Sequence, residues 1–319
     1  MSHKPFAIFT VIVGNYDTVK QPTVIDDRFD YIIFTDTPIT NPGIWQVRQV
    51  TYESKKQWLK ARYPRLNTGL CLSEYEASLY IDGNIQITSQ YVYDRCVELA
   101  ECGVEWASIK HQGRVGLYSE INAIIGLGWV HDYDVIDWYA YMQKDGFPDN
   151  LGLFENNIIF RKHTQNVDKV NAIWWWSIEH FSFRRDQFAL MYALWKVPEI
   201  KTGYFLSENE NAWNNAGHFI CENHNPHKRI LDKTLWEKLR DRYVRMFYSS
   251  GGWEIYYTKW FDTLLKPLSK RSHTYIHTYI HTYARLAMHI WTAWMLVRYD
   301  LGFICKRVVE RVKRLMFKK

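Results

Sequence analysis

The sequence predicts an α/β domain built on a mostly parallel central sheet with helices on both faces. Short runs rich in β-branched and aromatic residues, such as Phe6–Val13 and Ala77–Ile81, alternate with longer amphipathic stretches through the first two thirds of the 319 residues. Strands that alternate with helices are typical of doubly wound parallel sheets. Hydrophobic residues make up 47% of the chain and charged residues 23%, which is enough apolar surface for a packed core.

Before residue 230, five segments are predicted strands and five are predicted helices, and Leu231–Phe247 is predicted as a further, charged amphipathic helix. The strands are Phe6–Val13, Tyr31–Phe34, Ala77–Ile81, Trp106–Lys110 and Phe154–Arg161. The helices run from Ser54 to near Pro64, over Tyr91–Glu101, from Asp132 to near Lys144, and over Val167–His180 and Arg185–Lys196. A capping-box pattern, Ser54 followed by Gln57, marks the expected start of the first helix.

Polar segments directly follow several of the predicted strands. They are Gly14–Asp17, Asp36 and Asp82–Asn84. Doubly wound sheets bind ligands where their parallel strands end. We therefore expect these segments to line a single cleft.

The charge distribution favours an anionic partner and sets the C-terminal end apart. The formal net charge is +6, and from Arg285 onward nine Lys or Arg residues stand against two acids. Without this end the chain is close to neutral, which argues against nucleic acid as a partner. Five cysteines without paired metal spacing predict reduced thiols in a cytosolic protein. The apolar run near the N-terminus lacks a small-residue cleavage site, so it is interpreted as a strand and not as a signal peptide.

Asp82–Asn84 is the strongest local motif, because a predicted strand runs directly into it. A carboxylate and an amide oxygen at a strand end can hold Mg²⁺ or Mn²⁺, which prefer oxygen ligands and keep positions open for phosphate. Gly83 leaves room for a phosphate to approach. An ordinary turn is the alternative interpretation of this triplet.

The chain resembles a bacterial and plant glycosyltransferase-like family, first described as a domain of unknown function, whose plant members include mucilage-related proteins. The similarity extends over about residues 6–228 and leaves out the C-terminal end. The matching stretches are Val13–Asp17, Asp30–Asp36, Leu79–Asn84, Ile109–His111, Gly152–Glu155, Ile159–His163, Trp175–Trp176 and Arg185–Gln187. The resemblance implies a GT-A-like, Rossmann-like fold. It also implies a site layout similar to that of the retaining family-8 galactosyl- and glucosyltransferases.

The resemblance assigns metal and catalytic roles to residues from several segments. Asp82, Asn84 and a late histidine would hold Mn²⁺ or Mg²⁺. His227 is preferred for this third ligand, with His224 second and His218 also considered. Asp186 would bind sugar hydroxyls, and the amide oxygen of Gln187 would lie beneath the anomeric carbon. A capping acid at a helix start is the alternative interpretation of Asp186.

Glu155 and a set of basic and aromatic residues complete the expected site. A carboxylate at residue 155 among apolar and amide residues is suited to stabilise an oxocarbenium-like transition state, and a solvated strand-end acid is the alternative. Trp174–Trp176 is expected to pack mainly in the core, although one of its rings is suited to carry an acceptor sugar. Expected donor-binding residues are Thr10, Tyr16, Asp36, Lys60, Arg62, Lys110, His111 and Arg114.

The expected domain organisation is a GT-A catalytic domain over residues 1–229 and a helical, basic and aromatic region over residues 230–319. Leu286–Ile304 is apolar but contains His289, Arg298 and Asp300, which argues against a transmembrane span. With its tryptophans and basic neighbours it fits a helix lying on an anionic membrane surface, or one packed on the catalytic domain. His273–Tyr283 is a four-residue repeat in which no metal is expected.

The expected function is transfer of a hexosyl unit from a UDP-hexose to a lipid-linked or growing glycan, with retention. The expected setting is bacterial surface polysaccharide synthesis, of O-antigen or capsule, at the cytoplasmic face of the inner membrane. Two alternatives remain: a nucleotidyltransferase on a similar sheet, and a non-catalytic module that binds sugar or RNA.

Overall fold

The computed structural model describes residues 4–126, 129–130, 135–148 and 150–224. The chain divides into two compact units, residues 1–121 with 134–230, and residues 122–133 with 231–319. In the second unit only residues 122–126 and 129–130 are described. The expected membrane-surface region, the His273–Tyr283 repeat and His227 lie outside the described residues.

A seven-stranded sheet in the order β3-β2-β1-β4-β7-β6-β8 forms the centre of the first unit. Strand β7 runs antiparallel to both neighbours, and the other strand pairs of this sheet are parallel. The strands are β1 Phe6–Ile12, β2 Phe29–Thr35, β3 Gln46–Gln49, β4 Ala77–Ile81, β6 Trp106–Lys110, β7 Phe154–Lys162 and β8 Thr202–Tyr204. This mostly parallel sheet with flanking helices confirms the predicted Rossmann-like α/β fold class.

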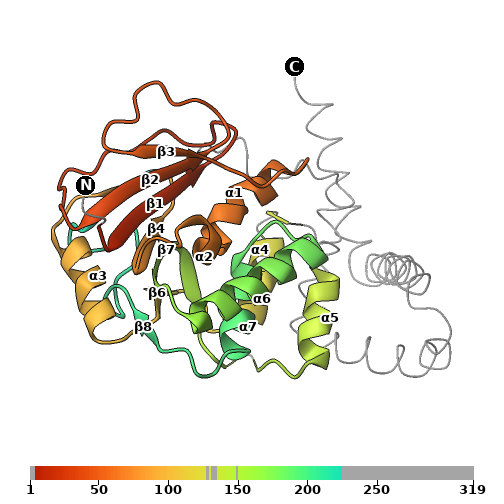
Figure 1. Cartoon of the computed structure of the whole chain (residues 1–319). Helices are drawn as coiled ribbons and strands as arrows, with labels where there is room; N and C mark the ends of the chain where they lie inside the picture. Colours follow the sequence, from red (N-terminus) through yellow and green to blue (C-terminus); the bar gives the residue numbers. More distant parts are fainter. Residues whose placement is uncertain (1–3, 127–128, 131–134, 149, 225–319) are drawn as a thin grey trace, which may run out of the picture. The chain divides into compact units, whose positions relative to one another are not determined.

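Helices cover both faces of this sheet (Figure 1). Helix α3 lies on one face, whereas α1, α6 and α7 pack on the other, where α1 contacts β1 and α7 contacts β7. The helices are α1 Gln57–Leu66, α2 Thr68–Cys71, α3 Tyr91–Glu101, α4 Leu117–Gly126, α5 Ile136–Lys144, α6 Gln165–Phe181 and α7 Gln187–Trp195.

Alternation along the strands gives the sheet two apolar faces. Ile8, Ile33 and Leu79 are fully buried in the core cluster that includes α3. On the opposite face, the indole of Trp106 lies 5.7 Å from that of Trp174 in α6. Strands buried on both faces explain the continuous apolar runs in the sequence.

A small second sheet brings a late segment back to the end of β4. Its strands are β5, Ile85–Ile87, and β9, Phe219–Cys221, which pair antiparallel. Just beyond β9 the backbone N–H of Glu222 donates to the carbonyl of Asn84 at 3.0 Å. This pairing places the chain around residue 222 beside the Asp82–Asn84 turn.

The first helix differs from its prediction at both ends. It begins at Gln57 and not at Ser54, whose hydroxyl instead accepts from the backbone N–H of Lys56 at 3.1 Å in a local turn. The predicted capping box is therefore wrong. The Ser54 hydroxyl accepts from the backbone N–H of Lys56 and not from the start of the helix, and Lys56 is the N-cap of the helix. The helix also continues past Pro64 to Leu66, since its last two residues are buried.

Two further predictions concern the thiols and membrane crossing. Cys71, Cys96, Cys102 and Cys221, the cysteines in the described part, are free thiols, as predicted. Within the described residues, no helix combines the length and the apolar character that crossing a bilayer requires.

We predict that Trp174→Ala lowers the free energy of unfolding by about 3–5 kcal/mol, because its indole is fully buried and its loss leaves a cavity. The indole N–H also donates to the carbonyl of Asp186 at 2.7 Å. Trp176→Ala is the matched control, since that neighbouring side chain is 39% exposed, and its cost should be much smaller. Urea denaturation measures both; equal losses would contradict this packing.

Candidate functional site

The polar segments that follow β1, β2 and β4 meet at one edge of the sheet, as predicted. The backbone N–H of Gly14 donates to Asp36 Oδ1 at 2.8 Å, which joins the ends of β1 and β2. A Cβ placed on Gly83 would lie 3.1 Å from the Asp17 side chain, so these two loops are in close contact. A side chain at residue 83 would therefore crowd Asp17 unless that neighbour shifted.

Asp82 and Asn84 present oxygen atoms suited to a hard cation. Tyr80 donates its hydroxyl to Asp82 Oδ1 at 2.6 Å, which fixes the carboxylate. Asn84 donates its amide N–H to the carbonyl of Glu222 at 2.5 Å, while its Oδ1 is buried without a hydrogen-bond partner in the structure. An orphaned carbonyl oxygen beside a fixed carboxylate fits a Mg²⁺ or Mn²⁺ ligand pair.

His224 is the described histidine that the fold brings to this turn. Its Nδ1 lies 2.9 Å from Asp17 Oδ1, and its ring centroid lies 5.3 Å from that of Tyr16. Because a carboxylate only accepts, Nδ1 carries a proton, and Nε2 is the nitrogen through which a neutral ring could bind a ligand. His218 instead stacks on Tyr91 at 3.9 Å. Among the described residues no group of three or more His, Cys, Asp or Glu side chains is close enough to hold a metal.

Arg65 connects the Asp82 turn to Asp186, a role that no local sequence pattern predicts. Its Nη1 lies 2.9 Å from Asp186 Oδ2 and 3.6 Å from Asp82 Oδ1. A second guanidinium nitrogen donates to the carbonyl of Asn156, and the group lies over the Tyr80 ring at 4.3 Å. The Arg65 side chain is buried between two predicted site residues.

Asp186 is a buried, ionised carboxylate. Burial alone would raise its pKa, but Arg65, Arg62 and Arg185 outweigh burial and lower it. The residue is the N-cap of α7, yet its side chain makes no capping hydrogen bond. Its carboxylate pairs with arginine instead, so capping does not account for the position of this side chain.

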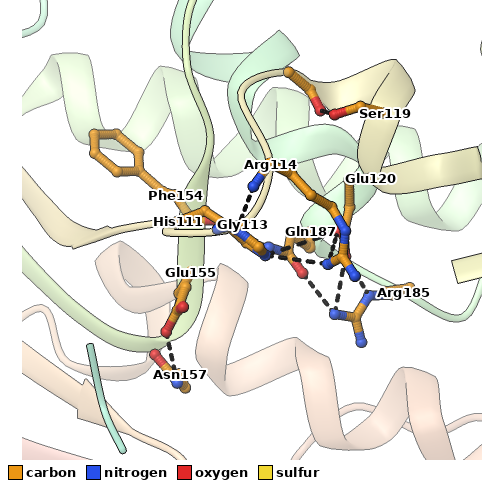
Figure 2. Close-up of polar contacts among 11 residues, drawn as sticks. His111, Gly113, Arg114, Ser119, Glu120, Phe154, Glu155, Asn157, Arg185 and Gln187 are labelled. Atoms are coloured by element: carbon orange, nitrogen blue, oxygen red, sulfur yellow. Dashed lines mark hydrogen bonds and ion pairs between the residues drawn. The ribbon is translucent and has the colours of Figure 1, made fainter. Parts of the chain in front are cut away.

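Gln187 lies in a second polar network, centred on Glu120 (Figure 2). Glu120 is completely buried and accepts from Arg114 and from Arg185. Arg185 also donates to Gln187 Oε1, and Gln187 Nε2 donates to the carbonyl of Phe154. Neither Glu120 nor Arg185 is predicted from the sequence as an individual site residue.

His111 borders this network as a neutral imidazole. Its Nδ1 accepts from the backbone N–H groups of Gly113 and Arg114, at 3.1 Å each. Burial lowers the pKa of His111 and outweighs the opposing effect of Glu120. This ring therefore shapes the loop after β6 and carries no charge at neutral pH.

Glu155 is a poorly solvated carboxyl beside the same network. Burial raises its pKa, the hydrogen bond from Asn157 at 3.3 Å lowers it, and the charge of Glu120 raises it further. The net effect is a pKa above the usual value. A solvated strand-end acid does not describe this environment.

The other expected donor-binding residues lie in varied surroundings. Thr10 is buried, Asp36 accepts a hydrogen bond from the backbone of Gly14, and the ring of Tyr16 packs on His224. Lys60 lies 3.6 Å from Glu53, and Arg62 lies 3.8 Å from Asp186. Lys110 pairs with Glu208 on the surface, away from the buried network. The structure thus brings Arg62 and Arg114 into the buried pairs, whereas Lys60 and Lys110 form surface pairs.

Comparisons with known proteins give structural neighbours only. No family model and no curated protein matches the chain. WbbM, a bifunctional glycosyltransferase, aligns with 63% of this chain and 38% of its own, at 12% identity and a TM-score of 0.37. The galactosyltransferase LgtC, in complex with donor and acceptor sugar analogs, aligns over 62% and 72%, at 12% identity and a TM-score of 0.34.

Core-mannan synthase A of Aspergillus fumigatus, in an Mn/GDP form, aligns over 73% of this chain and 82% of its own, at 12% identity and a TM-score of 0.40. The chain thus spans well under half of WbbM and most of the other two. The assignment of the site rests on the residues of this chain.

We predict that Glu155→Gln raises the free energy of unfolding at pH 7. Because the folded-state pKa of Glu155 is raised, its contribution to stability is full below the unfolded pKa and is lost as pH rises through the folded pKa. The variant should match the parent at pH 4 and exceed it at pH 7 in denaturant titrations. Exposed Glu101→Gln is the control and should change little at either pH; a Glu155→Gln variant that is less stable at pH 7 would contradict the assignment.

Proposed function

We propose that this chain is a metal-dependent glycosyltransferase that moves a hexosyl unit from a UDP-sugar to a glycan acceptor with retention. One observation carries the proposal: buried Arg65 joins the oxygen-rich Asp82 turn to the ionised carboxylate of Asp186 at the carboxyl edge of the sheet. The proposed diphosphate site and the proposed sugar site would therefore lie side by side. Transfer from a nucleotide sugar requires this juxtaposition.

On the diphosphate side, Asp82 and the Oδ1 atom of Asn84 would hold Mg²⁺ or Mn²⁺. His227 or His224 would complete the set, and Asp17 already orients His224. When bound, the cation neutralises the charge that develops on the leaving diphosphate. Tyr80 contributes by fixing the Asp82 carboxylate in one orientation.

On the sugar side, two carboxyl groups have distinct environments. Asp186 is kept ionised by its arginines and is suited to accept hydrogen bonds from sugar hydroxyls. Glu155 lies where water is scarce, so its negative charge would act strongly on positive charge that develops at the anomeric carbon. Gln187 supplies an amide whose orientation is fixed between Arg185 and the Phe154 carbonyl.

The proposed setting is bacterial surface polysaccharide synthesis at the cytoplasmic side of the inner membrane. The acceptor would be a lipid-linked or growing glycan. Residues 230–319 would bring the enzyme to the anionic lipid surface. Support comes from the nine Lys or Arg residues against two acids from Arg285 onward.

A panel of UDP-sugars with Mn²⁺ tests the proposed activity. We expect release of UDP, by slow donor hydrolysis without acceptor and faster transfer with one. A nucleotidyltransferase would instead release no UDP from these donors but would release pyrophosphate from UTP and a sugar 1-phosphate, and a binding module would turn over no donor. Either of these results would contradict the proposal.

We predict that Asp82→Ala abolishes Mn²⁺-dependent binding of UDP while the fold is retained, because the change removes the charged oxygen ligand. Isothermal titration calorimetry with UDP and Mn²⁺ measures the affinity. Asp94→Ala is the control, since Asp94 pairs with Arg28 and accepts from Gln90 at an exposed site on α3. Unchanged affinity in Asp82→Ala would remove the metal assignment.

We predict that truncation after Ser269 leaves donor turnover intact and abolishes sedimentation with anionic liposomes. Each basic residue near an anionic surface contributes about 1 kcal/mol, so losing the basic end removes most of the attraction. Binding of the full chain should weaken with salt, because screening shortens to about 3 Å at 1 M. Liposome binding that survives truncation, or loss of the folded domain, would contradict the membrane proposal.

A further inference from the structure

Glu120 is a completely buried carboxylate whose two oxygens are both bound by arginine. Arg114 Nη1 donates to Oε2 at 2.5 Å, and Arg185 donates to Oε1 through Nη2 at 3.0 Å and Nε at 3.2 Å. The carboxylate is 0% exposed, whereas the arginine side chains are 26% and 30% exposed. The acid is thus the inner anchor of the cluster, and the arginines extend from it toward the surface.

Net stability alone does not account for such a cluster. Well-packed apolar residues usually replace a buried ion pair at little cost or with a gain. A buried ion pair can instead serve to fix the geometry of a neighbouring side chain. The neighbour here is Gln187, because Arg185 Nη2 donates to its Oε1 at 2.7 Å.

The contacts of Gln187 permit one orientation of its amide. Its Nε2 donates to the carbonyl of Phe154 at 3.0 Å, and the residue is 5% exposed. Arginine has only donors and a carbonyl only accepts. A flipped amide would oppose donor to donor and acceptor to acceptor, so the fork of Arg185 determines which way the amide points.

We infer that Glu120 is a positioning residue, which fixes the Arg185 fork and through it the side-chain amide of Gln187 for glycosyl transfer. This inference rests on the proposed function for its effect on turnover. Three hydrogen bonds make this connection. Glu120 accepts from Arg185, Arg185 donates to the amide oxygen of Gln187, and the amide nitrogen of Gln187 donates to the carbonyl of Phe154. Figure 2 shows these contacts as dashed lines.

Glu120→Gln and Arg185→Lys should each lower kcat by on the order of 100-fold, as a misplaced catalytic group does. The KM for the donor should change little. Lysine keeps the positive charge of residue 185 but lacks the planar fork that reaches two partners. Because Arg185 is part-exposed, this second variant remains informative if loss of the buried acid prevents folding.

A double-mutant cycle separates positioning from a merely structural role. In a Gln187→Ala background, Glu120→Gln and Arg185→Lys should cause no further loss of kcat, because the group they position is gone. The inference would be overturned if either substitution lowered kcat further in the Gln187→Ala background. An unchanged kcat in the Arg185→Lys single variant would also overturn it. Glu105→Gln is the matched control. Glu105 accepts hydrogen bonds from Thr164 and from the Lys201 backbone at the opposite end of β6, so its loss should leave kcat unchanged.

A measurement that does not depend on activity tests the positioning of Gln187 separately from the proposed function. The side-chain amide signals of Gln187 can be assigned in ¹⁵N NMR spectra by their absence in Gln187→Ala. We expect slow solvent exchange in the wild type and fast exchange in Arg185→Lys. If the wild type turns over no nucleotide sugar, the proposed function fails while this signal still decides the positioning role. Slow exchange in both proteins would show that Arg185 does not hold the amide.

Discussion

The ion pair between Arg65 and Asp186 is the interaction on which the site depends. Both side chains are buried, so neither charge could remain without the other. Removing one partner of a buried pair typically lowers the free energy of unfolding by about 3–5 kcal/mol. Arg65 lies near the end of α1 and Asp186 at the start of α7, so their pairing joins two helices on the same face of the sheet. Asp82 Oδ1 lies 3.6 Å from Arg65 Nη1, so a second carboxylate, at the end of β4, faces the same guanidinium.

Three consecutive residues at the start of α7 face three separate partners. Arg185 pairs with Glu120, Asp186 with Arg65, and Gln187 with the carbonyl of Phe154. The short turn before α7 is therefore anchored on both sides, and Trp174 of α6 also donates to its backbone. Asp186 and Gln187 are thus oriented by arginines that are themselves held by buried partners, and such fixed polar groups are what a preorganised site requires.

The elements that could be predicted from the sequence are those with local signals. Ala77–Ile81, Tyr91–Glu101 and Trp106–Lys110 have the predicted bounds, because apolar periodicity and turn residues define them locally. The three-residue strands β5, β8 and β9 are too short for such periodicity. Arg65 and Glu120 were missed for another reason: a basic residue late in a helix and an acid in a first turn are ordinary locally, and only their distant partners make them part of the site.

The most direct test of the account locates the nucleotide and the cation. Crystals grown with UDP and Mn²⁺ can be measured at the manganese absorption edge, where anomalous scattering identifies the ion. We predict one strong manganese peak within coordination distance of the Asp82 carboxylate, with the diphosphate of UDP bound to the same ion. A peak elsewhere, or UDP bound away from the Asp82–Asn84 turn, would contradict it.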